Sequence, residues 1–446
     1  MVASREGLKV TGFHRSLMSI VSLLLACGTV FDTTIADEPV PPSTYRQKHF
    51  AIGAFWPIFP DNADLDLRLH EMAEANFNLV FGPVAGCSPT QLVELCEKNE
   101  LSVITYALGN GSQLPTGDAC WGYRLWDEPA TTQFSKLRQR AIDIRKRRPG
   151  MLDYINLYPN YASEKQLGIK PNKGRSAKRA SYDEYVRRFV EQLEPAVLCY
   201  DNYPIFKPGP GGLSSRSKIH LDLYIENLDT VRKHALQQKI PFWNYFNAVP
   251  YGPHTDPTEG QQRWQIYSSL TYGAKGVLYF TYGTPDTFEF PRGGGLLDRN
   301  GRRTNNWYEA QEINAALKHL GPTLMQLTSE AVFRIRPGDD TANLLTGTPI
   351  RRIYPADVFG GDPANDYLVG VFRHRDGRRA VLLTNYRFAF GAWPTVEFNA
   401  PAKSILEVDQ RTGHEVPLLD ENPAMEGFQI GLKSGAGRLF LLPAGK

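Results

Sequence analysis

Two adjacent carboxylates, Asp127 and Glu128, stand where the sequence changes from a strand pattern to a helix pattern. The mostly apolar run from Gly122 to Trp126 predicts a short strand that delivers them to its C-terminal end. Pro129 stops this strand and suits the first turn of a helix, which the pattern predicts from 130 to 148. An acidic group at such a strand tip is suited to proton transfer, and we predict Glu128 to be a catalytic acid.

Asp201 is the best candidate for a second acidic group, because it ends another apolar run, 196–202. Partial burial and Asp127 beside it would raise the pKa of Glu128, as a proton donor requires. Two structural alternatives stay open. Asp127 could be a helix N-cap, and Asp201 could form a turn before Asn202 and Pro204.

Short apolar runs that alternate with amphipathic segments must position these side chains. Alternation of this kind over residues 49–322 predicts a (β/α)₈ barrel, whose chemistry lies at the C-terminal ends of its strands. A doubly wound sheet is disfavoured because no glycine fingerprint follows the first run. The third crossover, 110–121, is too short for a full helix. The runs are 50–59, 76–82, 101–109, 122–127, 152–158, 196–202, 241–247 and 276–282.

The sequence pattern changes in residues 323–446, where short apolar runs follow one another without helical segments between them. Two apolar runs flank Asp376 and Gly377, which predicts a β-hairpin with a tight turn. Further short runs of strand character follow to the C-terminus. We therefore predict a small antiparallel β-sandwich after the barrel.

The first 36 residues resemble an export signal: basic residues precede an apolar run that is short for a membrane span. Residues 37–48 then form a proline-rich linker. Cys27 follows a lipoprotein-like box, so a lipid anchor is an alternative to free export. The sequence therefore predicts a secreted or periplasmic protein, with no later membrane span.

Composition excludes several function classes. A formal net charge of +3 provides no general field for nucleic acid. No Cys or His spacing matches a metal site and no glycine loop matches a phosphate cradle, so neither a metal nor an organic cofactor is expected. Cys199 lies in an apolar run and is expected in the core, whereas a bridge of Cys87 with Cys96 or Cys120 stays open.

The other side chains at the expected strand tips suit a sugar. Amides and hydroxyls can pair with sugar hydroxyls, and aromatic faces can stack on sugar rings. We therefore expect an oligosaccharide or polysaccharide as substrate. The predicted contacts are Trp56, Tyr158, Asn202, Tyr203, Trp243, Asn247 and Tyr282.

Three stretches resemble known glycoside hydrolases. The triplet 127–129 resembles the Asn-Glu-Pro of clan A enzymes such as cellulase family 5, with Asp127 in place of Asn. Residues 263–280 and 296–301 are similar to family 42 β-galactosidases. The resemblance implies a barrel, hydrolysis of glycosidic bonds, and an acid/base role for Glu128.

The sequence departs from that clan at the tip of the seventh strand. The clan places its nucleophilic Glu there, but residues 242–249 contain no carboxylate. Three explanations stay open: Asp201 serves as the second carboxylate, the substrate's own N-acetyl group attacks, or the barrel binds glycans without hydrolysis. The second fits the adjacent pair 127–128, which is also similar to family 20 hexosaminidases.

The loops after the fifth and sixth strands are rich in basic residues. An anionic glycan, sulfated or uronic, would be attracted by this charge, although a solvated flexible loop explains it equally simply. The residues are Lys165, Lys170, Lys173, Arg175, Lys178, Arg179, Lys207, Arg216 and Lys218.

Overall fold

The computed structural model describes most of the chain after the predicted export segment. The described ranges are 42–57, 59–60, 63–106, 113–170, 175–208, 215–290, 294–354, 366–424 and 426–444, without the side chains of 175–177 and 215–216. They belong to one compact unit. Residues 1–36, including Cys27, lie outside these ranges, as do Lys173 and the side chains of Arg175 and Arg216.

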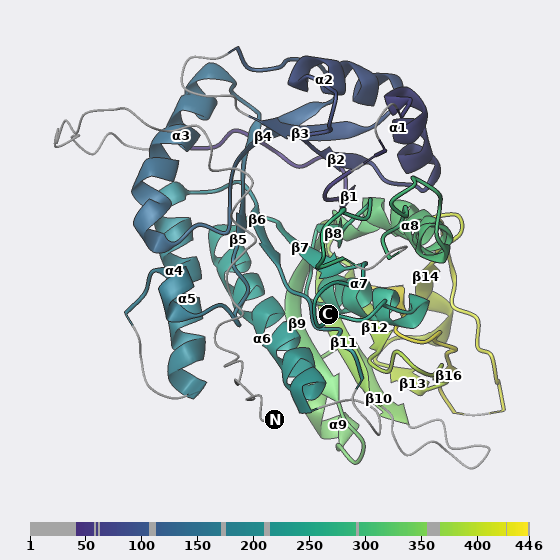
Figure 1. The fold of residues 1–446 in the computed structure, drawn as a ribbon. Coiled ribbons are helices and arrows are strands. Elements are labelled where there is room, and N and C mark those ends of the chain that lie inside the picture. The colour runs from purple at the N-terminus through teal and green to yellow at the C-terminus, as the bar shows by residue number, and fades with distance from the viewer. Residues whose placement is uncertain are drawn as a thin grey trace, which may run out of the picture. The chain divides into compact units, whose positions relative to one another are not determined.

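The first and larger part of the unit is a closed barrel of parallel strands that follow one another in chain order (Figure 1). The predicted barrel is therefore confirmed. Its strands are β1 (Ala51–Ala54), β2 (Leu79–Phe81), β3 (Ser102–Tyr106), β4 (Cys120–Asp127), β5 (Leu152–Leu157), β6 (Leu198–Asp201), β7 (Phe242–Asn247) and β8 (Gly276–Phe280).

Helices follow the strands, except in the third crossover, where none of the described residues 113–119 is helical. Capping residues begin several of them: Ser88, for example, forms a capping box with Gln91. The helices are α1 (Leu65–Glu74), α2 (Pro89–Lys98), η1 (Thr131–Gln133), α3 (Phe134–Arg147), α4 (Glu164–Leu167), α5 (Arg175–Leu193), α6 (Ser215–Gln238), α7 (Glu259–Thr271) and α8 (Asn305–Leu324).

Alternate strand residues fill the barrel interior, since successive side chains of a strand point to opposite faces. Phe81, Tyr154, Tyr245 and Leu278 pack together there. Cys199 lies with them, 3.1 Å from the Tyr154 hydroxyl, so its predicted core position is confirmed. The four described cysteines are free thiols, so no bridge joins Cys87, Cys96 and Cys120.

The C-terminal part is an antiparallel β-sandwich, as predicted. One sheet has the order β15-β14-β17-β12-β11-β9, and the other has the order β10-β13-β16. The β11–β12 hairpin turns at Gly377, whose φ of 95° favours glycine. The elements are β9 (Leu327–Ile335), α9 (Thr341–Leu344), β10 (Ile350–Tyr354), β11 (Tyr367–His374), β12 (Arg379–Asn385), β13 (Thr395–Phe398), η2 (Ala402–Ser404), β14 (Leu406–Val408), β15 (Glu415–Pro417), β16 (Phe428–Gln429) and β17 (Gly437–Leu442).

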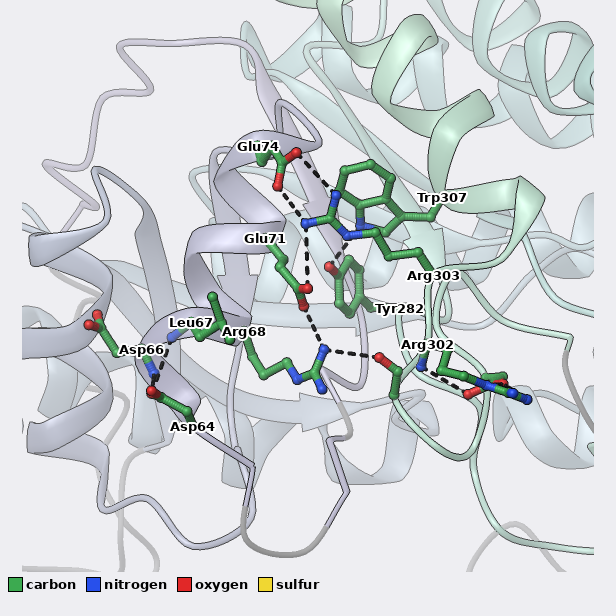
Figure 2. A network of polar contacts seen from close by, with 12 residues as sticks. Asp64, Asp66, Leu67, Arg68, Glu71, Glu74, Tyr282, Arg302, Arg303 and Trp307 are labelled. Atoms are coloured by element: carbon green, nitrogen blue, oxygen red, sulfur yellow. Dashed lines mark hydrogen bonds and ion pairs between the residues drawn. The ribbon is translucent and has the colours of Figure 1, made fainter.

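A cluster of ion pairs fastens the segment after β8 to α1. Figure 2 shows the Arg303 guanidinium over the Trp307 ring, 3.9 Å from its centroid, beside Glu71 and Glu74. Arg68 binds both Glu71 and the carbonyl of Gly301. These contacts join α1, which follows the first strand of the barrel, to the segment that follows its last strand. No helix among the described residues is long and apolar enough to cross a membrane.

Candidate active site

A bulge near the end of β4 brings Arg124 and Asp127 to the same side of the strand. The pairing of β4 with β5 shifts between Arg124 and Trp126, which places one extra residue in β4. Arg124 and Asp127, which a regular strand would point to opposite faces, then form an ion pair of 2.7 Å. This irregularity hid Arg124 from sequence reasoning.

Asn156 joins the acidic groups of two strands. Its Nδ2 donates to Asp127 Oδ1 at 3.2 Å and to Asp201 Oδ1 at 3.1 Å. The predicted convergence of β4 and β6 is therefore present in the structure. The amide oxygen of Asn156 is buried and has no partner among the described residues. The side chain is therefore held through its Nδ2, by the carboxylates of Asp127 and Asp201.

Glu128 follows β4 with a φ of 50°, a left-handed conformation that is uncommon outside glycine. Its backbone N–H donates to the carbonyl of Asn156 at 2.8 Å, which extends the β4–β5 pairing by one residue. Burial raises the pKa of its carboxyl well above the ordinary value, and the charges of Asp201 and Asp127 raise it further. Glu128 is thus a carboxyl group that keeps its proton at pH values where a free Glu would lose it.

The surroundings of Asp201 also oppose the ionisation of its carboxyl group. It is buried at the tip of β6, and burial together with Asp127 raises its pKa to about 8, against the opposing hydrogen bond from Asn156. Glu128 and Asp201 influence each other, so their protons belong to the pair rather than to either residue. The pair therefore keeps its protons to a higher pH than free carboxyl groups would.

Aromatic residues surround the carboxyl groups. Tyr158 is half-buried, and its pKa rises to about 12 because of burial and then Glu128, Asp127 and Asp201. Asp201 and Glu128 also raise the pKa of Tyr203, after burial. The same two carboxyls act on Tyr161 and Tyr251, which sequence reasoning missed. Both lie in loops after strand tips, and that position was their only available signal.

Trp56 belongs to an aromatic wall beside this cluster. Its ring centroid lies 5.9 Å from that of Phe280, which lies 4.9 Å from that of Tyr203. Phe290 closes the wall against Tyr251 at 5.5 Å. Trp56, Tyr158 and Tyr203 thus gather as predicted, and the half-buried Trp56 and Tyr203 leave part of their surfaces open to solvent.

The four other predicted sugar contacts are buried and bind partners outside this cluster. Trp243 is buried beside Gly276, at the N-terminal end of the strands, and donates to Gln47. Asn202 turns outward to Asn227 of α6, and Asn247 accepts from the backbone of Ile205. Tyr282 is buried outside the barrel, where its hydroxyl accepts from Trp307. Strand ends alone did not reveal which way these side chains point.

The tip of β7 has no carboxylate, and the residues after it do not replace one. Asp256 accepts from Asn306, and Glu259 pairs with Arg263 in the first turn of α7. His254, in the same loop, is buried against Phe206 and Tyr251. Glu289, which follows β8, adds to the field that raises the pKa of Tyr251.

The described basic side chains of the β5 and β6 loops are exposed. Lys178 Nζ donates to the carbonyl of Tyr161 at 3.4 Å. Arg179 is engaged by Asp229 at 3.1 Å. The other exposed cations are Lys165, Lys170, Lys207 and Lys218.

No group of three or more His, Cys, Asp or Glu side chains within the described ranges could hold a metal ion. A cavity of about 1250 Å³ lies at the opposite end of the barrel, between the start of β7 and Arg232, Lys275 and Ser329. The carboxyl cluster rather than this cavity is the candidate site, because (β/α)₈ barrels of enzymes carry their reacting groups at the C-terminal ends of the strands.

Fold and site together define a (β/α)₈ barrel protein with a cluster of acidic residues at the C-terminal ends of β4 and β6. No protein-family model matches the chain, and no curated protein matches it significantly.

Solved structures with a similar fold include several glycoside hydrolases. A catalytic mutant of a GH42 β-galactosidase from G. stearothermophilus shares 10% identity, covering 90% of this chain and 100% of that one, with a TM-score of 0.47. The β-galactosidase from Bacillus circulans sp. alkalophilus shares 9% identity over 88% and 99%, with a TM-score of 0.44. That from the psychrophilic Marinomonas ef1 shares 12% over 60% of each chain, with a TM-score of 0.36. The barrel of this chain is established by its own strand order and not by these likenesses.

Proposed function

We propose that the protein is an exported glycoside hydrolase in which Glu128 is the general acid and Asp201 the second carboxyl group. The observation that carries the proposal is the bridge of Asn156 between Asp127 and Asp201, with the raised pKa of Glu128 beside it. Glycoside hydrolysis requires one carboxyl that is protonated and another that attacks or activates water. Trp56, Tyr158 and Tyr203 would bind the sugar.

A matched pair of variants tests this role. Glu128→Gln removes the proton donor at constant size, so turnover of a panel of aryl glycosides and polysaccharides should fall by about 10²- to 10⁴-fold. Glu259→Gln, in the first turn of α7, serves as the control and should leave the rate within about two-fold of wild type, the small change typical of a surface substitution. Equal rates for Glu128→Gln and wild type would contradict the proposal.

A second candidate is hydrolysis assisted by the N-acetyl group of the substrate. It is favoured by the tip of β7, which has no carboxylate, and by Asp127, whose two oxygens are oriented by Arg124 and Asn156. Asp127 would then hold the amide N–H of a 2-acetamido sugar. In that case Asp127→Asn would abolish turnover of N-acetylhexosaminides, whereas Asp201→Asn would retain much of it.

The exposed lysines of the segments after β5 and β6 support an anionic glycan as substrate. Binding of a sulfated oligosaccharide to the Glu128→Gln protein should weaken as salt rises, because the lysines are solvated and their fields are screened. A neutral oligosaccharide of equal length should show little change. Equal, salt-independent affinity for both would remove this part of the proposal, and binding without turnover by wild type would identify a glycan-binding barrel instead.

A further inference from the structure

The cavity of about 1250 Å³ lies at the N-terminal ends of β6, β7 and β8, at the end of the barrel opposite the carboxyl cluster. The segment before β1, the C-terminal parts of α5 and α6, the start of β9 and the turn between β11 and β12 complete its wall. Small-molecule sites typically enclose roughly 300–1,000 Å³, so the space is ample for such a ligand.

The wall of this cavity carries an excess of positive charge. Five of its lining side chains are cationic and two are acidic, and one of the two acids, Glu191, is already paired with Arg187 at 2.5 Å. The other acid is Glu194. The cationic residues are Arg46, Arg232, Lys239, Lys275 and Arg375.

The ends of two helices account for the two lysines. Lys239 directly follows α6, and Lys275 Nζ donates to the carbonyls of Leu324, the last residue of α8, and Leu327. A cation is favourable at these places because the C-terminal end of a helix is partly negative. The three arginines do not lie at helix ends, so their gathering here needs another explanation.

Arg232 is half-buried in α6 and is held toward β9, which lies beside this helix (Figure 1). Its Nε donates to Ser329 Oγ at 2.8 Å, whereas its two Nη groups make no hydrogen bond among the described residues. Burial lowers its pKa, and the charge of Asp229 opposes that shift without an ion pair, since Asp229 binds Arg179. A cation that is partly removed from water without a paired anion is unfavourable.

Arg46 and Arg375 are exposed and also have no carboxylate partner among the described residues. Arg46 Nη1 donates only to backbone carbonyls, those of Ser43 and Tyr45, at 3.3 and 2.8 Å. Arg334 of the sandwich, by contrast, pairs with a carboxylate at 2.7 Å. A guanidinium group presents a fork of donors that matches the oxygens of a phosphate or sulfate group.

We propose that this cavity binds a small polyanion that carries phosphate or sulfate groups, with Arg232 as the anchoring residue and Arg46 and Arg375 nearer to solvent. Such a ligand would offset the excess of positive charge and pair the guanidinium groups that have no carboxylate. A hollow site suits a small ligand better than a flat membrane surface. The site lies at the other end of the barrel from Glu128, so it does not depend on the proposed function.

The test is isothermal titration calorimetry of the full chain at physiological ionic strength with tripolyphosphate, sucrose octasulfate and, as the neutral comparison, sucrose. At least one of the two anions should bind and sucrose should not, and the stronger anion distinguishes a phosphate-bearing from a sulfate-bearing ligand. Arg232→Gln should weaken binding by about 10- to 100-fold, because charge-assisted hydrogen bonds are lost.

The matched control is Lys207→Gln, which removes one exposed charge in the segment after β6, at the other end of the barrel. Its affinity should stay within about two-fold of wild type, because charges more distant than a Debye length are screened. If Arg232→Gln does not fold, the double variant of the exposed Arg46→Gln and Arg375→Gln decides, and it should weaken binding by about ten-fold.

Several results would overturn the proposal. They are the absence of binding by both anions, an equal loss of affinity in Arg232→Gln and Lys207→Gln, and an unchanged affinity in the double variant. Binding to vesicles of anionic phospholipid without binding of the soluble anions would point to a membrane surface and would also overturn it. Since none of these variants changes the carboxyl cluster, a protein that hydrolyses no glycoside would disprove the proposed function and leave this inference to its own test.

Discussion

At the scale of single residues, the site is governed by where protons reside. Glu128 and Asp201 both have raised pKa values because burial and neighbouring acidic groups oppose their ionisation. A hydrolase of this kind works when the pair holds one proton. Its rate should therefore depend on two apparent pKa values that belong to the pair.

The pH dependence of kcat/KM follows from this. The rate should rise with pH as the pair loses its first proton and fall as Glu128 loses the second, which gives a maximum in the neutral to alkaline range. Asp201→Asn should remove the rising limb, because only one titrating carboxyl is left. A profile that peaks near pH 4, with the same shape in both proteins, would contradict this assignment.

The free energy of unfolding should also depend on the charge of Asp201, and it should be greater at low pH. The folded-state pKa of Asp201, about 8, exceeds its ordinary value, so its contribution is present at low pH and is lost as pH rises toward 8. Asp201→Asn keeps an acceptor for Asn156 but removes the buried charge. At pH 8 its free energy of unfolding should exceed that of wild type by at least about 1.4 kcal/mol, the value of one pKa unit. Urea unfolding at pH 5 and pH 8 measures it, and an unchanged difference between the two pH values would contradict it.

At the scale of elements, α3 and β5 are joined by a buried ion pair. Arg145 donates to Asp153 at 2.8 Å, and the two side chains are only 3% and 2% exposed. Arg145 also binds the carbonyls of Leu193 and Glu194, where α5 ends. One guanidinium thus ties together a strand and the C-terminal ends of two helices.

Removal of one partner should be costly because the other charge stays buried. Asp153→Ala should lower the free energy of unfolding by about 3–5 kcal/mol. The matched control is Asp143→Ala, which breaks the exposed pair with Arg147 and should cost less than about 1 kcal/mol. Similar urea midpoints for the two variants would show that the buried pair is not important for stability.

At the scale of the whole molecule, the sandwich packs against α7 of the barrel. The Trp264 ring lies 5.2 Å from that of Tyr386, and Arg263 donates to the carbonyl of Ser434. The backbones approach closely at Gly260, where an added Cβ would lie 2.3 Å from the carbonyl oxygen of Phe388. The two folds therefore meet by backbone contact as well as through side chains.

Gly260→Ala tests the importance of this contact. Gly260 lies in the first turn of α7, and alanine has a higher helix propensity than glycine, so in the absence of the sandwich it would stabilise α7. The clash with Phe388 should reverse the sign and lower the thermal midpoint. Gly321→Ala in α8 is the comparison, since its Cβ would meet only the Phe50 side chain at 3.0 Å and should have a smaller effect. An increase in midpoint for Gly260→Ala would show that the interface yields easily.

The sequence by itself determined the succession of elements and the acidic strand tips. Apolar runs that alternate with helical patterns are a local property of the chain, and they predicted the barrel, the sandwich and the convergence of Asp127 and Asp201. Closure of parallel strands in chain order then brings their C-terminal ends together, whatever the details of packing.

Only the tertiary structure decided which way the tip side chains point. Trp243 and Tyr282 have the aromatic character of a sugar platform, but one lies at the other end of the barrel and one faces α8. Arg124 reaches Asp127 only because β4 contains an extra residue, a displacement that no periodic pattern reveals. Side-chain direction depends on register and on neighbours distant in sequence, and those are established only when the barrel closes.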